Sequence, residues 1–195
     1  MRRRISNTFL AFQATRSGLT LGDGVTFFGR PIVTRAEGGR IEVGNRVVLC
    51  SDSRRTSLGV SRPVILRASD ASAEIVIGDD SGLSGTTIVS MRSVRIGRRC
   101  LIGADVLITD TDFHPVDLGA MDVSSRRYAP PPQPSSHDVV VIEDDVFIGA
   151  RTVVLKGTHI GRGSVVGAGS VVVGEIPPGV IAAGAPARII RNIPA

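Results

Sequence analysis

Residues 142–177 read IEDDVF, IGARTV, VLKGTH, IGRGSV, VGAGSV and VVGEIP when they are divided into blocks of six. A branched aliphatic residue opens every block: Ile142, Ile148, Val154, Ile160, Val166 and Val172. A period of six fits neither an α-helix, which repeats every 3.6 residues, nor an isolated half-buried strand, which repeats every two. It is typical of a coil whose flat sides are short strands and whose corners are tight turns. The stretch therefore predicts an all-β fold, a parallel β-helix of hexapeptide repeats.

The same period runs, with interruptions, through most of the chain before this stretch. Earlier blocks open at eleven further positions: Leu21, Phe27, Val33, Val43, Leu49, Ile77, Leu83, Val89, Ile96, Ile102 and Ile108. Aromatic residues make up only 4% of the 195 residues and there is no tryptophan. That composition suits a narrow core filled by β-branched side chains, in which each coil packs mainly against the next. We therefore expect one β-helix domain over residues 19–193.

Residues 1–18 do not follow the period. Ile5, Phe9 and Phe12 fall instead at helical spacing, which predicts a short amphipathic helix. We expect this segment to be a helical cap over the open end of the β-helix, because exposed strand edges invite aggregation. The alternative is contact with a membrane through the arginines at 2–4 and the apolar side of the helix. Of the two interpretations the cap is favoured.

The period stops at Thr109. The next residues, 110–117, read DTDFHPVD, and the segment from there to residue 138 carries four prolines and the only tyrosine, Tyr128. We place a long extruded loop insertion at about residues 115–138. Loops of this length inside a compact domain are uncommon and often functional. We expect the loop to contact an acceptor molecule through Tyr128 and the arginines at 126–127.

The formal net charge is +5 at pH 7, and of the 23 basic residues only Lys156 is a lysine. A basic protein can attract nucleic acid, anionic lipid or small anionic ligands. The arginines are scattered along the chain, apart from residues 2–4, and no helix-turn-helix, RRM or zinc-finger pattern is present. We therefore expect no nucleic-acid partner.

The two cysteines, Cys50 and Cys100, stand alone in the sequence. A disulfide framework is not expected, in agreement with a reducing compartment. No apolar run approaches the ~20 residues that span a bilayer. The N-terminus has arginines but lacks the apolar core and cleavage site of a signal peptide. Together these features predict a cytoplasmic protein.

Three motifs carry a resemblance to a known family. They are the hexapeptide blocks, the DTDFHP segment at 110–115 before a long loop, and the tail IPPGVIAAGAPARII at 176–190. Over about residues 19–193 the chain resembles the left-handed β-helix acyltransferases. More narrowly, it is similar to the galactoside and maltose O-acetyltransferases and their relatives from polysaccharide gene clusters. The resemblance implies a left-handed prism with three strands per coil, a homotrimer, and acetyl-CoA as co-substrate.

Acyl transfer from a thioester to an alcohol needs a base, stabilisation of the oxyanion and an aligned donor. Imidazole is the side chain whose ordinary pKa lies close enough to neutrality to serve as that base. His114 lies where a core strand breaks into the loop, beside Pro115, and it matches the catalytic base of the family. His137 is interpreted as structural, and His159 as a solvent-exposed corner residue.

Asp110 and Asp112 lie just before His114. A carboxylate here can orient the imidazole, as it does in a catalytic triad, or it can cap a turn. Asp112 is the weakly favoured orienting residue. Where the galactoside enzymes have an asparagine on an earlier coil, this chain has Ser84 followed by Gly85. Ser84, or a backbone N–H near Gly85, is the candidate for stabilising the oxyanion.

The resemblance also implies a coenzyme A site in a groove between two subunits. By position, the contacts fall on seven residues: Gly149, Ala150, Gly167, Ala168, Val173, Arg188 and Arg191. Small residues let pantetheine approach the backbone, and arginines can form paired hydrogen bonds with phosphate oxygens. The steric demands of the corners explain the glycines and alanines equally well.

The leading hypothesis is an acetyl-CoA-dependent O-acetyltransferase that modifies a sugar hydroxyl in surface polysaccharide or glycan biosynthesis. An N-acetyltransferase of a nucleotide-linked amino sugar is the nearest alternative. A zinc enzyme like the γ-class carbonic anhydrases needs three converging histidines, but here they are 23 and 22 residues apart, so no metal is expected. A non-catalytic β-helix scaffold is the third alternative, although it would not require His114 at the start of a long loop.

Overall fold

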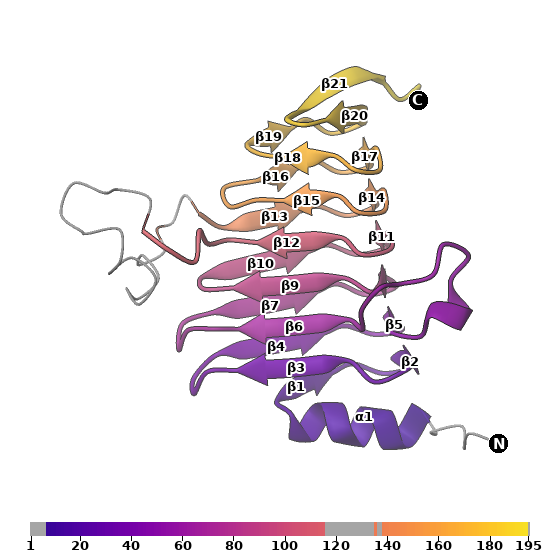
Figure 1. Ribbon diagram of the computed structural model, residues 1–195, viewed down its shortest axis with the longest axis vertical. Coiled ribbons are helices and arrows are strands. Elements are labelled where there is room, and N and C mark those ends of the chain that lie inside the picture. Colours follow the sequence, from indigo (N-terminus) through magenta and orange to yellow (C-terminus); the bar gives the residue numbers. More distant parts are fainter. Residues whose placement is uncertain (1–6, 116–134, 136–137, 195) are drawn as a thin grey trace.

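The chain forms a left-handed parallel β-helix with three strands per coil and one N-terminal helix across its first coil (Figure 1). The computed structural model describes residues 7–115, 135 and 138–194. The predicted loop insertion at about 115–138, with Tyr128 and the arginines at 126–127, therefore lies almost entirely outside the described residues. Within the described ranges no helix combines the length and apolarity that a bilayer crossing needs.

Three sheets form the sides of the prism, and the chain visits them in a fixed order. In the described residues, sheet A consists of β1 (Leu19–Leu21), β4 (Arg40–Val43), β7 (Glu74–Ile77), β10 (Ser93–Ile96), β13 (Val140–Ile142), β16 (His159–Ile160) and β19 (Glu175–Ile176). Sheet B consists of β2 (Thr26–Phe28), β5 (Val48–Cys50), β8 (Gly82–Ser84), β11 (Leu101–Ile102), β14 (Phe147–Ile148), β17 (Val165–Val166), β20 (Val180–Gly184) and β21 (Ala187–Asn192). Sheet C consists of β3 (Ile32–Arg35), β6 (Ile65–Ala68), β9 (Thr87–Ser90), β12 (Leu107–Thr109), β15 (Val153–Val154) and β18 (Val171–Val172). We name the edges between them the A–B, B–C and C–A corners.

The residues that open the hexapeptide blocks form the core. Parallel register stacks them directly, for example Ile96 on Ile142 and Ile142 on Ile160 in sheet A. All six openers of residues 142–177 are at most 1% exposed, so the prediction from the period is confirmed. Small residues four places later are buried as well, and their hydroxyls reach backbone carbonyls at the corners. Thr152 donates to the carbonyl of Gly149 at 2.8 Å, so burial of this hydroxyl is compensated by a hydrogen bond.

The N-terminal helix α1 (Asn7–Arg16) lies across the first coil (Figure 1). Its existence was predicted, but Phe9 and Phe12, two of the residues that suggested it, do not belong to the core, and Ile5 lies outside the described residues. Leu10 and Ala14 are buried and belong to the core, whereas Phe9 and Phe12 are 49% and 57% exposed. The end of the coil is narrow, so only one face of the helix can pack against it. Leu10 and Ala14 are four residues apart and therefore lie on one face of the helix.

The A–B corner carries charged side chains that connect successive coils. The residues in the left-handed backbone conformation at this corner include Arg46, Asp80, Arg99 and Asp145, with φ of 55°, 61°, 55° and 64°. Arg46 pairs with Asp80 on the next coil, and Arg99 with Asp145, both at 2.6 Å. Such solvent-exposed pairs contribute little to stability, because water screens the charges. The alternating signs nevertheless disfavour a shift of one coil against its neighbour.

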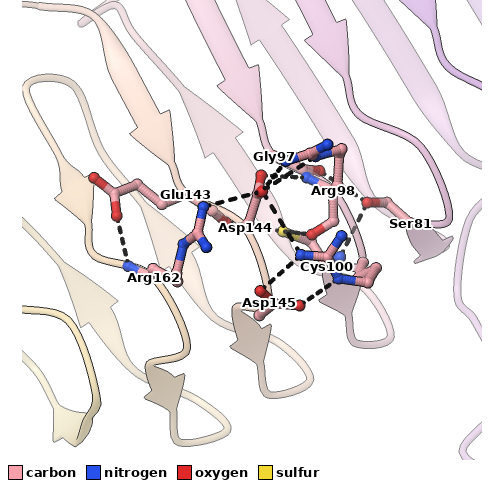
Figure 2. Close-up of polar contacts among 9 residues, drawn as sticks. Ser81, Gly97, Arg98, Cys100, Glu143, Asp144, Asp145 and Arg162 are labelled. Carbon is pink, nitrogen blue, oxygen red and sulfur yellow. Dashed lines mark hydrogen bonds and ion pairs between the residues drawn. The ribbon is translucent and has the colours of Figure 1, made fainter.

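Figure 2 shows the part of this corner around Asp144. The Asp144 carboxylate accepts the backbone N–H of Arg98 at 2.8 Å and pairs with the guanidinium of Arg98 at 3.0 Å. It also pairs with Arg162 one coil further on, at 3.3 Å. Hydrogen bonding to the Arg98 backbone is the main cause that lowers the pKa of Asp144. One carboxylate thus joins three coils across the point where the chain returns from the insertion.

The contacts of Glu74, on the outer face of sheet A, lead to a prediction of how the stability of the fold depends on pH. Its carboxylate accepts from Ser93 and Arg95, both at 2.8 Å, and pairs with Arg40 at 2.7 Å. Burial acts to raise the pKa of Glu74, but the hydrogen bonds from Arg40, Arg95 and Ser93 outweigh it and lower the pKa to about 2. A depressed carboxyl pKa contributes stability above the unfolded value of 4.5 that is lost as the pH falls toward 2.

We therefore expect the melting temperature of the wild type to fall between pH 5 and pH 2, and Glu74→Gln to show a smaller fall over that range. Thermal unfolding followed by circular dichroism at several pH values measures this. Glu37→Gln, at an exposed site, is the matched control. Equal acid sensitivity in wild type and Glu74→Gln would contradict the prediction.

Candidate active site

The candidate site begins at a buried carboxylate where β12 reaches the C–A corner. Asp110 is fully buried. Its carboxylate accepts the backbone N–H groups of Met91, Arg92 and Ser93, at 2.7, 2.8 and 2.7 Å, and the hydroxyl of Ser90 at 2.8 Å. Asp110 therefore holds the turn between β9 and β10 on the preceding coil. Of the two roles considered for this aspartate, the geometry gives it the turn-capping one.

A tight turn after Asp110 carries His114 outward. Thr111 is buried, and its hydroxyl accepts the N–H of Phe113 at 3.1 Å. Phe113 has a φ of 61°, and the N–H of His114 donates to the carbonyl of Asp112 at 2.7 Å. His114 itself is exposed on this chain. Its imidazole is thus at the surface of one edge of the prism, where a ligand or a second copy can reach it.

Lys156 holds the two ends of the insertion together. It lies after β15, on the next coil of the same C–A corner, and its ammonium pairs with Asp112 at 2.7 Å and with Asp138 at 3.3 Å. Hydrogen bonding to Asp112 is the largest cause that raises the pKa of Lys156, and Asp138 adds to it. The Asp112 carboxylate, predicted to orient the imidazole, is thus fixed by a lysine. Sequence reasoning missed this role, although the only lysine among 23 basic residues was a signal.

Ser84 and the small residues predicted to line a coenzyme A groove lie along a different edge. Ser84 ends β8 at the B–C corner, and Gly149 and Gly167 follow β14 and β17 at the same corner. Ala150 and Ala168 come directly after these glycines. A methyl group on Gly149 would collide with the backbone nitrogen of Ala168 on the next coil, so close stacking by itself requires that glycine.

The remaining predicted residues lie near the C-terminal end of the prism. Val173 follows β18 at the C–A corner, the corner of His114, and is 44% exposed. Arg188 and Arg191 are exposed on β21, which turns back antiparallel to β20 and pairs Arg188 with Ala183. Both guanidinium groups are therefore available at the surface above sheet B.

One chain does not bring all these residues together. His114, Asp112 and Val173 share the C–A corner, whereas Ser84 and the Gly–Ala pairs share the B–C corner, on the opposite side of sheet C. On a single chain the predicted site residues therefore lie at two separate edges of the prism.

The other histidines do not join His114. His159 is exposed on sheet A and lies 2.9 Å from a carboxylate oxygen of Glu143, in keeping with its interpretation as a solvent-exposed residue. His137 lies outside the described residues. In the part of the chain that the structure describes, no three His, Cys, Asp or Glu side chains gather as metal ligands.

Comparison with known proteins identifies the class. The model of the hexapeptide repeat of succinyl-transferase matches residues 93–120 and 139–173. A solved structure of a galactoside acetyltransferase in complex with coenzyme A is 25% identical and superposes with a TM-score of 0.55, covering 89% of this chain and 64% of that one. The repeats and the three-sheet coil thus define a hexapeptide-repeat protein with the left-handed β-helix fold.

Curated relatives share shorter regions. The 2,3,4,5-tetrahydropyridine-2,6-dicarboxylate N-acetyltransferase of Clostridium perfringens is 51% identical over 78 residues, 40% of this chain and 31% of that protein. The putative lipopolysaccharide biosynthesis O-acetyl transferase WbbJ of Escherichia coli K12 is 43% identical over 105 residues, 54% of this chain and 53% of that protein. The chain thus spans about a third to a half of the length of these relatives. Over these regions the chain is similar to hexapeptide-repeat acetyltransferases.

Proposed function

We propose that this protein transfers an acetyl group from acetyl-CoA to a sugar hydroxyl in the biosynthesis of a surface polysaccharide or another glycan. The observation that carries the proposal is His114, presented at the edge of the β-helix by a turn that the buried Asp110 anchors. The similarity to an O-acetyl transferase of lipopolysaccharide biosynthesis supports a glycan acceptor. The use of acetyl-CoA places the proposed reaction in the cytoplasm.

The chemistry assigns His114 the role of general base. An imidazole nitrogen takes the proton of the acceptor hydroxyl as its oxygen attacks the thioester carbonyl. The tetrahedral intermediate then collapses, the C–S bond breaks, and the imidazolium returns the proton to the sulfur of coenzyme A. No atom is gained or lost overall, and no metal is required. Asp112, held by Lys156, acts as a positioning residue for the turn that carries the base.

The second half of the proposed site comes from a neighbouring copy in a homotrimer. Its B–C corner presents Ser84, which can donate a hydrogen bond to the oxyanion, and the stacked Gly149–Ala150 and Gly167–Ala168 pairs, along which pantetheine can lie. Val173 borders this groove from the corner of His114. Arg188 and Arg191 supply guanidinium groups for the phosphates of coenzyme A.

A specific observation keeps transfer to nitrogen as a second candidate. The Clostridium perfringens relative, which shares 51% identity over its matched region, is an N-acetyltransferase. Incubation of the protein with acetyl-CoA and a panel of neutral and amino sugars separates the two reactions. An O-acetyl ester is cleaved by hydroxylamine, whereas an amide survives. Transfer only to amino groups would replace the O-acetyl proposal by the N-acetyl one.

Binding of coenzyme A tests whether the protein is an enzyme of this kind or a non-catalytic scaffold. Titration calorimetry of the full chain with coenzyme A is expected to show binding that weakens in Arg188→Gln, because a phosphate contact is lost. Analytical ultracentrifugation of the same sample is expected to show a trimer. Absence of coenzyme A binding in a folded protein would favour the scaffold.

Lys156→Met is expected to lower the rate of acetyl transfer by about 10- to 100-fold, because release of Asp112 loosens the turn that carries His114. The ion pairs of Lys156 are partly exposed, so the free energy of unfolding is expected to change by at most about 1 kcal/mol. Lys156→Arg keeps the charge and should restore most of the rate. Steady-state kinetics of the three proteins measure this, and a normal rate in Lys156→Met would remove the positioning role.

A further inference from the structure

A pocket of about 490 Å³ lies on the outer face of sheet A, across the first residues of β7, β10 and β13. Its volume falls in the range of small-molecule sites. The residues that matter for its chemistry are Ser72, Glu74, Arg92, Ser93, Arg95 and Val141. The wall formed by β13 follows directly on Asp138, where the chain returns from the insertion. The pocket is therefore next to the corner that carries His114.

The charged side chains of this pocket differ in whether they are paired with an opposite charge. The Glu74 carboxylate is fully engaged, since it accepts from Ser93 and Arg95 and pairs with Arg40. In doing so it fixes the guanidinium of Arg95 on one side. Arg92 is exposed, and among the described residues no carboxylate lies within ion-pair distance of its guanidinium. The pocket thus holds one positive charge that the described part of the chain does not neutralise.

Arg92 is tied to the candidate base through the backbone. The N–H groups of Arg92 and Ser93 both donate to one oxygen of the buried Asp110 carboxylate, at 2.8 and 2.7 Å. Asp110 begins the segment that leads to His114 on the next coil of the same corner. A buried carboxylate with four hydrogen bonds is a rigid connection. The backbone of Arg92 is therefore held at a fixed position relative to the start of the segment that carries His114.

We propose that this pocket binds the anionic group of the acceptor, so that the acceptor is an acidic saccharide bearing a carboxylate or a phosphate ester. A guanidinium makes paired, charge-assisted hydrogen bonds with either group, and the guanidinium of Arg92 has no carboxylate partner among the described residues. A neutral sugar would leave this positive charge unmatched in the pocket. The inference rests on the proposed function, since it specifies the acceptor of that same reaction.

Three probes with one sugar ring test the proposal: glucuronate, glucose 1-phosphate and glucose. Titration calorimetry with the full chain is expected to show that at least one charged probe binds about tenfold or more tightly than glucose, the effect of one charged hydrogen bond. Arg92→Gln is expected to abolish this difference. The comparison of glucuronate with glucose 1-phosphate shows whether the pocket prefers a carboxylate or a phosphate. Arg67→Gln, at an exposed site on sheet C, is the matched control and should bind as the wild type does.

Several outcomes would overturn the proposal. Equal binding of charged and neutral probes would do so, as would undiminished binding of the charged probes by a folded Arg92→Gln protein. Loss of glucose 1-phosphate binding in Arg188→Gln but not in Arg92→Gln would assign the phosphate to the coenzyme A groove instead. Because binding is measured without acetyl transfer, a protein that binds acidic probes but transfers nothing would refute the proposed function alone. Acetylation of acidic and neutral sugars at equal rates by the wild type, with both rates unchanged in Arg92→Gln, would refute this inference alone.

Discussion

Replacement of His114 by alanine is expected to lower the rate of acetyl transfer by at least about 100-fold, the usual contribution of a general base. Without the imidazole, the acceptor hydroxyl must lose its proton to water as it attacks the thioester. His114 is exposed on the chain, so the core and the melting temperature should be unaffected. Steady-state assays of coenzyme A release, with circular dichroism on the same samples, measure both effects.

The structure offers a matched control for this experiment. His159 is exposed on the outer face of sheet A, where its ring contacts the carboxylate of Glu143. His159→Ala should transfer acetyl groups at the wild-type rate. Coenzyme A binding by His114→Ala should also be retained, because the groove is assigned to other residues. A His114→Ala protein that keeps more than a tenth of the wild-type rate would show that His114 is not the base.

Replacement of Asp110 by alanine is expected to have the largest effect on stability. The substitution leaves the backbone N–H groups of Met91, Arg92 and Ser93 without their acceptor. A buried donor without a partner costs about 1–3 kcal/mol, so the free energy of unfolding should fall by about 3–5 kcal/mol. For a chain of this size that corresponds to a melting temperature lower by about 6 °C or more.

The same substitution should also impair catalysis, and the two effects can be separated. At a temperature well below its unfolding transition, Asp110→Ala is still expected to transfer acetyl groups slowly, because the segment leading to His114 has lost its anchor. Asp23→Asn, which changes an exposed carboxylate, is the control and should match the wild type in both measurements. A melting temperature within about 2 °C of the wild type would mean that the Asp110 hydrogen bonds contribute little.

The sequence predicted the coil better than it predicted the site. Six block openers gave the period, and the structure buries all of them, because in a solenoid the inward direction recurs with the repeat itself. Handedness did not follow from the period. Parallel crossovers are usually right-handed, and only the resemblance to a family indicated the left hand. The helix was expected from Phe9 and Phe12, but burial depends on the shape of the coil end, which selects Leu10 and Ala14 instead.

The contacts of the candidate site were beyond a reading of the sequence for a physical reason. Asp110 and Ser93 are 17 residues apart, and Lys156 is far from Asp112 in the chain, yet each pair meets because it shares a corner on neighbouring coils. Such contacts depend on how many residues each coil uses, and the insertion makes that count irregular. The sequence could therefore identify Asp110 and Asp112 as candidates. It could not show that Asp110 is a buried anchor or that Asp112 is paired with a lysine.

The return of β21 along β20 also affects how molecules of this protein can associate. A bare coil end exposes unpaired N–H and C=O groups, onto which the next molecule could add and extend a fibre. Here β21 lies over the last strand of sheet B, and α1 lies over the first coil at the other end. End-to-end polymerisation is thereby disfavoured, and sideways contact along the long edges becomes the available route. Copies of this rod are therefore expected to meet flank to flank rather than end to end.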